Sequence, residues 1–580
     1  MHDKLRLSRL SLAYWNSGEA LQAWFLASLL AACTIAIVWL NMLLNNWQVG
    51  FYNQLQHYDS RGFFDCLRQF ITLAGFYVFA SGYQAYFRMA LEIRWRRWLT
   101  DRYIILWLHD QAYYRLNLTN PSVNPDQRIS EDIRLFIANT LDLSLGLLRH
   151  IVMLLVFSLV LWRLSGIATV SLSGLVLAVP GYLFWLALLY SALGTWFIIR
   201  FGRPLIARNI LQQSNEADFR SCLTRIKDDD ECIALQGGEK SERLNLAVFF
   251  RRITENYRCI ARHTRTITFI SAAYSQLSLV FAFLIAAPRY FNHELQLGQL
   301  FEISGAYWYV HSALSYIIDS FSKVALWKAV ASRLDSFSRQ MADAAGRGNS
   351  RKAITFTRSH QLKLKNLTVL SPAGHILLNN LSLELNARDR LLISGPTGCG
   401  KTALLRTIAG IWPYFTGAIS KPADGRIVFL PQKPYVPSGP LREALLYPGG
   451  QSLPDKRLAE TLKRCNLPGL AGKLEQSGDW EKCLSLGERQ CLAFARAILQ
   501  RPGWLFLDEA TSSVDRQTEH SLYRLLEETV PAPAIVSVGH RETLRPFHTL
   551  QLNLEDSGDW DMVPLGNDGF HSASKRLSLL

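Results

Sequence analysis

The sequence predicts a polytopic α-helical membrane domain with six spans, fused to an α/β P-loop nucleotide-binding domain. Two observations lead to this prediction. Six apolar stretches of near-membrane length precede residue 325 and none follows it, whereas a glycine-rich phosphate-binding pattern lies in the second half. The mean hydropathy of the 580-residue chain is only +0.07 because it averages the two halves. Apolar runs of this length exclude a wholly soluble chain and a disordered one.

The first half supplies the membrane-crossing helices, each of which needs about 20 mostly apolar residues. The candidate spans are residues 22–44, 69–90, 143–162, 179–199, 267–287 and 299–321. The shorter apolar segment 167–178, just before Pro180, is expected to be an external loop or a re-entrant segment. The first apolar run lacks a small-residue cleavage site, so we expect a retained helix rather than a signal peptide.

The distribution of Arg and Lys orients these spans. Cations are enriched in the connections after the second and fourth spans, before the fifth and after the sixth, and the opposite connections carry few. Because cytoplasmic loops carry the excess of Arg and Lys, both termini are expected in the cytoplasm. The chain has 62 Lys and Arg against 47 Asp and Glu, a net charge of +15. We attribute much of this charge to helix ends beside anionic membrane lipid, and we expect no nucleic-acid partner.

Two cytoplasmic connections, residues 91–142 and 200–266, are too long for simple loops. Both are polar, charged and mostly free of Pro and Gly, which predicts helices that extend well beyond the bilayer. Residues 124–128 (NPDQR) interrupt the first connection and Gly237-Gly238 the second, as expected for the turned ends of helical arms. These arms either transmit movement to the second half or are merely solvated faces.

A small, polar and basic segment near residues 335–357 separates the two halves and has the composition of a linker. We therefore predict four parts. They are a membrane domain with cytoplasmic helical extensions at 1–335, a linker at 336–357, a nucleotide-binding domain at 358–550 and a polar tail at 551–580. The tail carries no motif and is expected to be mobile.

The segment RLLISG at 390–395 runs into GPTGCGKT at 395–402, the spacing of a phosphate-binding loop between a strand and a helix. Its glycines let backbone N–H groups close around phosphates, and the helix N-terminus adds positive potential. Lys401 is expected to reach the β- and γ-phosphates, and Thr402 to ligate Mg²⁺. The predicted phosphate-binding residues are Gly395, Pro396, Thr397, Gly398, Cys399, Gly400, Lys401 and Thr402.

A second strand, WLFLDE at 504–509, ends in two carboxylates. An apolar run followed by an acid is typical of a buried parallel strand that delivers the acid to the carboxyl edge of a sheet. Asp508 is expected to hold the magnesium through water, and Glu509 to orient or activate the attacking water.

A third motif reveals the family that this half resembles. Residues 484–490, LSLGERQ, resemble the signature of ATP-binding cassette proteins and precede the helical pattern CLAFARAIL. The resemblance implies that the nucleotide is ATP. It also implies that Ser485, Gly487 and Glu488 are nucleotide-binding residues, with Ser485 facing the γ-phosphate bound by another cassette.

Three further residues match the same family in chain order. Gln432, in FLPQKPYV, matches the loop that senses magnesium and contacts the membrane domain. Asp515, in SSVD, matches the loop that crosses the dimer interface, and His540 matches the switch histidine that contacts the γ-phosphate. The resemblance thus implies Glu509 and His540 as catalytic residues and Thr402, Gln432 and Asp508 as residues of the magnesium site.

Two positions depart from the pattern. Ser371 stands where many cassettes place an aromatic side chain that stacks on adenine, so nucleotide affinity is expected to be weaker unless another ring substitutes. Cys399 lies inside the phosphate loop beside Lys401, where alkylation is expected to block ATP binding.

One chain carries one phosphate loop and one signature. In this family the signature of one cassette completes the ATP site of another, so the resemblance implies two chains. A homodimer is the simplest assembly in which both ATP sites are complete. A heterodimer with a related half is the alternative.

The membrane half adds a narrower resemblance, to the SbmA/BacA-type membrane domain. It rests on several short motifs. They are Asn45-Asn46-Trp47 with Phe51-Tyr52-Asn53, residues 94–99 (RWRRWL), residues 124–129 (NPDQRI) with 131–133 (EDI), Pro180-Gly181-Tyr182, and residues 216–220 (EADFR) with Gly238-Glu239. Fused to a cassette, such a domain is similar to the bacterial YddA-type half-transporters and to the peroxisomal fatty acyl-CoA (ABCD) half-transporters. The resemblance implies an exporter-like fold in the bacterial inner membrane, with the cassette in the cytoplasm.

These features predict an ATP hydrolase that drives a solute across the membrane. The alternative is a proton-coupled peptide-type transporter in which the cassette only regulates. Peptides, cobalamin-like molecules and acyl-CoA all occur around this branch, so the solute and the direction of transport stay open. Glu302 and His311 in the sixth span are ionisable, but they lie nine positions apart, which places them on opposed faces of a helix.

Overall fold

The structure is a computed structural model that describes residues 13–119, 124–172, 175–346, 354–357, 361–423, 426–449, 453–529 and 531–565. The chain divides into two compact units. The first comprises Met1–Ile104 and Pro125–Ser338, and the second comprises Ile105–Asn124 and Arg339–Leu580. Helix α11 (Phe321–Gly346) leads from one unit to the other.

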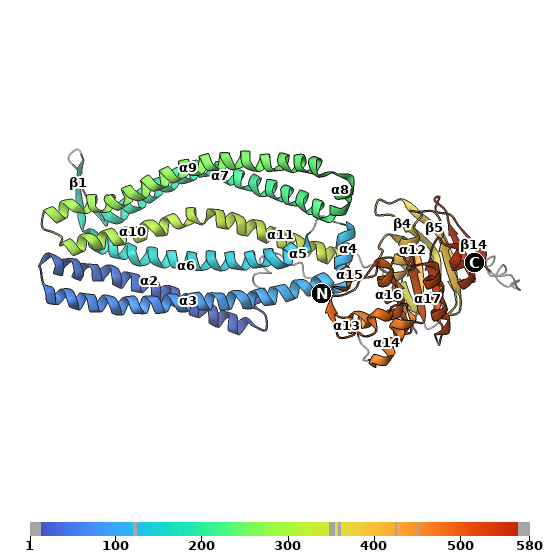
Figure 1. Cartoon of the computed structure of the whole chain (residues 1–580). Helices are drawn as coiled ribbons and strands as arrows, with labels where there is room; N and C mark the ends of the chain where they lie inside the picture. The colour runs from blue at the N-terminus through green and yellow to red at the C-terminus, as the bar shows by residue number, and fades with distance from the viewer. Residues whose placement is uncertain are drawn as a thin grey trace. The chain divides into compact units, whose positions relative to one another are not determined.

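Long helices build the first unit (Figure 1). Four of the six predicted spans lie entirely within them, whereas 179–199 begins before its helix and 299–321 runs beyond the end of its helix at Asp319. Helix α10 packs against α2, α6, α7 and α9, and the buried core between them includes Phe157, Ala187, Ala286 and Val310. The helices that carry the predicted spans are α2 (Ala20–Gln56), α3 (Ser60–Leu108), α6 (Ile133–Ser165), α7 (Tyr182–Asp228), α9 (Glu239–Phe291) and α10 (Leu297–Asp319).

Four of the described helical segments are long and apolar enough to cross a membrane: Ala20–Gln56, Ser60–Thr119, Pro125–Ser165 and Glu239–Phe291. The apolar part of α7, Tyr182–Gly194, is shorter, and α10 is not among the four. The polypeptide therefore has a helical membrane region, while the count of six spans stays a prediction.

The apolar segment before Pro180 forms a β-hairpin, which the sequence did not predict. Strands β1 (Ile167–Leu172) and β2 (Leu175–Pro180) pair antiparallel, with Ile167 opposite Pro180. Gly166 and Gly181 flank the hairpin with φ of 62° and 71°, a backbone conformation that glycine adopts at little cost. These two glycines turn the chain from α6 into the hairpin and from the hairpin into α7.

The helical arms extend as predicted, with more breaks. Helices α7 and α9 run side by side (Figure 1), and Asn256 Nδ2 donates to the Arg208 carbonyl at 2.9 Å. The short helix α8 (Asp230–Gln236) joins them and ends at Gly237, whose φ is 63°. In the other arm, the chain passes through η1 (His109–Gln111), α4 (Ala112–Thr119), α5 (Pro125–Gln127) and the π-helical turn η2 (Arg128–Asp132).

Helix α4 belongs to the second unit, although the sequence places it in a membrane-domain arm. Leu118 packs against an apolar cluster of that unit, and Arg115 Nη1 donates to the Ala344 carbonyl at 3.4 Å. Residues 91–142 are therefore divided between the two units, and their role as a coupling arm stays a prediction.

Two sheets form the second unit. The larger has the order β14-β13-β6-β12-β11-β8, in which only the β13–β14 pair is antiparallel, and the smaller has the order β3-β7-β4-β5. The strands of the larger sheet are β6 (Arg390–Ser394), β8 (Ile427–Leu430), β11 (Trp504–Asp508), β12 (Ala534–Val538), β13 (Leu550–Leu554) and β14 (Trp560–Pro564). The strands of the smaller sheet are β3 (Ile354–Thr357), β4 (Leu362–Leu370), β5 (Ile376–Leu385) and β7 (Phe415–Pro422).

The larger sheet is buried on both faces, as its continuous apolar strands predict. On β11, Leu505 and Leu507 join the cluster that contains α16, while Trp504 and Phe506 join the cluster that contains α12. The helices and short elements of this unit are α12 (Lys401–Ala409), β9 (Gly439–Pro440), α13 (Leu441–Leu446), α14 (Asp455–Arg464), η4 (Pro468–Leu470), β10 (Ser477–Gly478), α15 (Trp480–Cys483), α16 (Leu486–Gln500), α17 (Arg516–Glu528) and η5 (Glu542–Phe547).

The structure differs from the predicted polar tail at 551–580. Strand β13 lies beside β6 in the larger sheet, β14 pairs with β13, and Leu552 and Leu554 are buried. The fold therefore continues beyond residue 550, because alternate residues of this short segment are apolar and complete the sheet. The remainder of the predicted mobile tail, residues 566–580, lies outside the described part of the chain.

Candidate nucleotide-binding site

Three parallel strands deliver the predicted site to one edge of the larger sheet. The phosphate loop follows β6, the acid pair ends β11, and His540 follows β12. Asp508 lies opposite Val538 in register, and the Glu509 N–H donates to the Val538 carbonyl at 3.1 Å. Since the carboxyl ends of parallel strands meet at one edge, segments more than 100 residues apart converge there.

The phosphate loop has the backbone that such a cradle requires. Gly395, Gly398 and Gly400 have φ of 149°, 94° and 100°, and a Cβ on Gly395 would lie only 2.4 Å from the Leu554 carbonyl oxygen. Lys401 begins α12 and folds back over the loop, where its Nζ donates to the carbonyls of Gly395 at 2.8 Å and Pro396 at 2.6 Å. A phosphate at this point would meet an ammonium group and a helix N-terminus together.

Thr402 and Asp508 meet beside the loop. The Thr402 hydroxyl donates to Asp508 Oδ1 at 3.1 Å. Burial raises the pKa of Asp508 above its ordinary value, the bond from Thr402 lowers it, and the neighbouring Glu509 carboxylate raises it further. A hydroxyl and a carboxylate oxygen are hard ligands, the type that Mg²⁺ prefers, so Thr402 and Asp508 would suit a magnesium ion.

Glu509 lies in a strained backbone conformation. Its φ is 48°, which is uncommon for a residue with a side chain and typically costs about 1–3 kcal/mol. In this backbone conformation, the carboxylate of Glu509 lies near two other predicted site residues. Gln432 Nε2 donates to Glu509 Oε2 at 2.8 Å, and His540 Nε2 lies 3.7 Å from Glu509 Oε1. Glu509, Gln432 and His540 therefore form one polar group at the sheet edge.

The signature residues form a separate group at the start of α16. Ser485 is the N-cap, its Oγ accepts from the Glu488 N–H at 3.3 Å, and Glu488 Oε2 accepts from the Ser485 N–H at 2.9 Å. This capping box presents an exposed helix N-terminus. Gly487 lies against the loop after the acid pair, because a Cβ there would come within 2.7 Å of the Ser513 carbonyl oxygen.

Asp515 caps the next helix. Its Oδ1 accepts from the Thr518 N–H at 2.9 Å and its Oδ2 from the Thr518 hydroxyl at 2.7 Å. Both oxygens of its carboxylate therefore accept hydrogen bonds from the same chain. Asp515 is the last residue of the segment 512–515, which we call the 512–515 loop. Within the described residues, no hydrogen bond or ion pair joins Ser485 or Asp515 to the phosphate loop.

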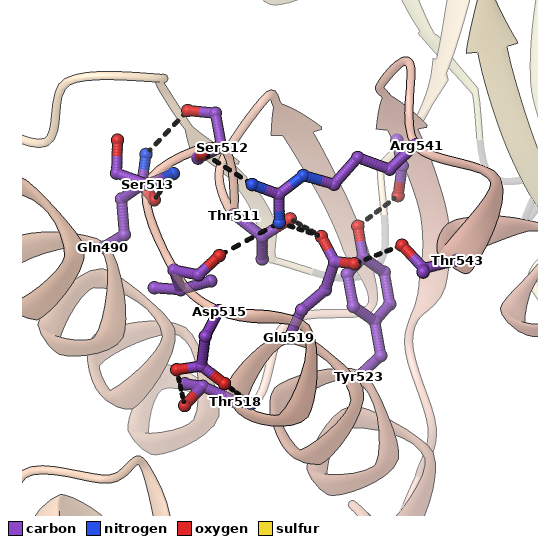
Figure 2. A network of polar contacts seen from close by, with 12 residues as sticks. Gln490, Thr511, Ser512, Ser513, Asp515, Thr518, Glu519, Tyr523, Arg541 and Thr543 are labelled. Atoms are coloured by element: carbon purple, nitrogen blue, oxygen red, sulfur yellow. Dashed lines mark hydrogen bonds and ion pairs between the residues drawn. The ribbon is translucent and has the colours of Figure 1, made fainter.

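Three residues that the sequence analysis did not single out connect these groups (Figure 2). Gln490 Nε2 donates to the Gln432 carbonyl at 3.0 Å and to the Ser512 hydroxyl at 3.2 Å. Arg541 contacts the 512–515 loop and the buried Glu519. Their positions gave some signal, since Gln490 ends the signature and Arg541 directly follows His540.

The structure also shows what Ser371 does locally. Its Oγ accepts from the His375 N–H at 3.1 Å, which closes the turn between β4 and β5. Trp412, the nearest large ring in the sequence after the phosphate loop, is buried and donates to the Leu370 carbonyl at 2.9 Å. Trp412 is therefore committed to the core and does not replace the missing aromatic side chain.

Comparisons with known proteins match both halves of the chain. The family described as ABC transporter transmembrane region 2 matches residues 12–291, and the family described as ABC transporter matches residues 378–512.

Individual relatives cover almost the whole chain. An "uncharacterized ABC transporter ATP-binding protein" of Haemophilus influenzae is 35% identical over 92% of this chain and 89% of its own length. The inner membrane ABC transporter ATP-binding protein YddA of Escherichia coli is 31% identical over 91% of this chain and 93% of its own. The chloroplastic ABC transporter D family member 2 of Arabidopsis thaliana is 29% identical over 94% and 85%. These matches confirm the resemblance to YddA-type and D-family transporters, and the chain belongs to the ABC transporter family, whose ATP-binding domain couples ATP hydrolysis to transport.

Proposed function

We propose that two copies of this chain form an ATP-driven transporter that moves a solute across the bacterial inner membrane. The observation that carries the proposal is the convergence of Lys401, Thr402, Asp508, Glu509 and His540 at one sheet edge. Phosphoryl transfer needs mainly positioning and charge stabilisation, and this set provides both.

Each residue has a distinct task. Lys401 leaves its loop carbonyls to neutralise the β- and γ-phosphates. Thr402 and Asp508 would hold Mg²⁺, which would supply further positive charge to the phosphates. Glu509 orients the attacking water and accepts its proton. Gln432 holds the Glu509 carboxylate with a 2.8 Å hydrogen bond, and His540 Nε2 lies 3.7 Å from the other carboxylate oxygen.

The exposed start of α16 supports a composite site. Ser485 is exposed at the N-terminus of α16, where its hydroxyl donates to Glu488 Oε2 at 2.9 Å, and a helix N-terminus favours negative charge. A second chain would place this N-terminus on the γ-phosphate held by Lys401, which gives two sites in a homodimer. A related half-transporter would satisfy the same geometry.

The membrane location follows from the helical first unit and the relatives. The described spans and the matched transmembrane family support a membrane protein, and the YddA relative is named as an inner membrane protein. The juxtamembrane cations support a cytoplasmic cassette beside anionic lipid.

Glu509→Gln tests the ATP-driven mechanism, because glutamine keeps the side-chain shape but cannot accept a proton. We expect ATP hydrolysis in proteoliposomes to fall by at least about 100-fold and ATP-bound dimers to accumulate. Phosphate release and cross-linking measure these effects. Glu542→Gln is the matched control, since Glu542 is exposed and its ion pair with Arg545 is long. Undiminished ATP-dependent uptake in inverted vesicles carrying Glu509→Gln would contradict the proposal.

One observation favours the proton-coupled alternative. His311, on α10, is buried against α7 and α9, with Ser191 Oγ 3.3 Å and Tyr274 Oη 3.2 Å from its Nδ1. An ionisable side chain at such a depth is often functional. Uptake driven by a pH gradient that survives Glu509→Gln but disappears in His311→Gln would favour this alternative.

A further inference from the structure

Arg541 holds the 512–515 loop by its backbone. Its Nη2 donates to the Ser512 carbonyl at 2.8 Å, and its Nη1 donates to the Val514 carbonyl at 3.0 Å (Figure 2). A guanidinium has five donors in a rigid planar fork, so it can bind two carbonyls on either side of Ser513 at once. An ammonium group on a flexible chain cannot hold the same geometry.

A buried carboxylate aims this guanidinium. Glu519 is only 1% exposed, and its Oε2 lies 3.4 Å from Arg541 Nη1. Thr511 Oγ1 donates to the same carboxylate at 2.8 Å, and the Thr543 hydroxyl binds its other oxygen. Because a buried charge must be paired and hydrogen-bonded, Glu519 has one stable arrangement, and that arrangement fixes Arg541.

Gln490 holds the same loop from the opposite side. Its Oε1 accepts from the Ser513 N–H at 3.0 Å, and its Nε2 binds Ser512 Oγ and the Gln432 carbonyl. Gln490 is fully buried, so this attachment is rigid. Loss of Arg541 would therefore shift the loop about this remaining anchor rather than unfold it.

The two anchors come from the elements that surround the reacting phosphate. Arg541 is bonded to His540 through one peptide, and Gln490 is bonded to the backbone of Gln432. A displacement of the His540 segment therefore pulls on the Ser512 and Val514 carbonyls directly.

We propose that Arg541 is a positioning residue that sets the 512–515 loop for ATP hydrolysis in the second copy of the chain. This inference rests on the proposed dimer with composite sites. In this inference, Arg541 of one chain affects ATP hydrolysis at the phosphate loop of the other chain. The effect starts at the His540 segment of the chain that carries Arg541.

Mixed dimers with two affinity tags separate the two directions. One chain carries Glu509→Gln, so only the phosphate loop of the other chain hydrolyses ATP. Arg541→Lys is placed either in the Glu509→Gln chain, where its loop faces the live site, or in the hydrolysing chain. Lysine keeps the charge beside Glu519 and protects the fold, and the thermal unfolding of each dimer checks this.

In the first arrangement we expect single-turnover hydrolysis to slow by about 10- to 100-fold, as for other misplaced positioning groups. The KM for ATP should stay within about twofold, since ground-state binding is unchanged. In the second arrangement the rate should change by less than about threefold. Arg545→Gln is the matched control, because Arg545 is exposed and its ion pair with Glu542 spans 3.8 Å.

Equal losses in both arrangements, or a loss confined to the hydrolysing chain, would overturn the inference and leave the dimer intact as a proposal. Full hydrolysis by a separated monomer would overturn both. Glu519→Gln in the Glu509→Gln chain provides a second test, because it releases the guanidinium without removing it. A wild-type rate in that dimer also counts against the role of Arg541.

Discussion

Individual residues in the cassette show how close approaches and burial determine what each position tolerates. A Cβ at Gly487 would lie 2.7 Å from the Ser513 carbonyl oxygen, too close for a side chain. Glu509 has a positive φ of 48° and accepts a hydrogen bond from Gln432. At both positions the backbone conformation is restricted, and segments from different motifs come into contact there. Such residues are sensitive to the smallest substitutions.

Gly487→Ala should therefore weaken both the fold and the reaction. The added methyl group would lie 2.7 Å from the Ser513 carbonyl oxygen, so the 512–515 loop must move. We expect a loss of about 1–3 kcal/mol in stability and a fall in ATP hydrolysis, measured by thermal unfolding and phosphate release. Gly472→Ala is the control, because no atom of the described residues lies within 4 Å of the position that its methyl group would take. Equal effects of the two substitutions would refute this account.

His548 should make the cassette sensitive to acid. It is buried, its Nε2 accepts from the Ser537 hydroxyl at 2.8 Å, and burial lowers its pKa from 6.5 to about 4. Because the unfolded chain takes up this proton first, stability is complete above pH 6.5 and falls as the pH drops toward 4. The loss is at most about 3 kcal/mol. Thermal unfolding of wild type against pH should show this slope, His548→Gln should flatten it, and the exposed His375→Gln should leave it unchanged.

Elements behave differently in the two units. The central strands of the larger sheet, such as β11 and β12, are short and nearly continuous in apolar residues, so their burial on both faces follows from composition. The arms of the first unit are long helices whose polar faces need specific partners. Asp132, at the end of η2, is 1% exposed and binds Arg128 at 2.8 Å and Arg333 at 2.6 Å. This ion triad joins η2 to α11.

Asp132→Asn should destabilise the first unit strongly, because it leaves two cations around a neutral amide. Removing one partner of a buried ion pair typically costs about 3 kcal/mol or more. Thermal unfolding in detergent, followed by circular dichroism, should show a clear decrease in the midpoint. Asp126→Asn, at an exposed position of the same turn, should leave the midpoint unchanged. A similar decrease in both variants would show that the triad is not the cause.

At the scale of the whole molecule, one chain places its phosphate loop and its signature in two separate polar groups. If two chains complete each other's sites, the rate of ATP hydrolysis depends on whether two inactivating substitutions lie in the same chain or in different chains. Lys401→Ala in one chain and Ser485→Ala in the other leaves one site intact in a mixed dimer. Both substitutions in the same chain leave none, even beside a wild-type partner.

We therefore expect the split mixed dimer to retain up to about half of the wild-type hydrolysis rate and the same-chain mixed dimer to lose nearly all of it. Phosphate release from doubly tagged dimers measures both. Self-contained sites predict the reverse order, because the wild-type partner would then work alone. The reversed result would exclude the composite site.

The motifs and the helices could be predicted because they depend on local patterns. Phosphate-loop glycines at fixed spacing, an acid pair after an apolar run and six apolar stretches are visible in one dimension. The hairpin of β1 and β2 could not be predicted, because its apolar residues are equally compatible with a loop or a re-entrant segment. Strands β13 and β14 were predicted as part of a polar tail, because their short sequences do not reveal that β13 pairs with β6. Strand pairing is a long-range contact, so composition alone could not reveal it.

The sequence by itself determined the two-part architecture, the ATP-binding motifs and the family, because each rests on residue types at short, fixed spacing. Only the tertiary structure decided that α4 belongs with the second unit, that Gln490 and Arg541 both bind the 512–515 loop, and that Glu519 pairs with Arg541. These contacts join residues from three separate segments. Their geometry arises from the parallel sheet edge, which brings the ends of distant strands within hydrogen-bonding distance.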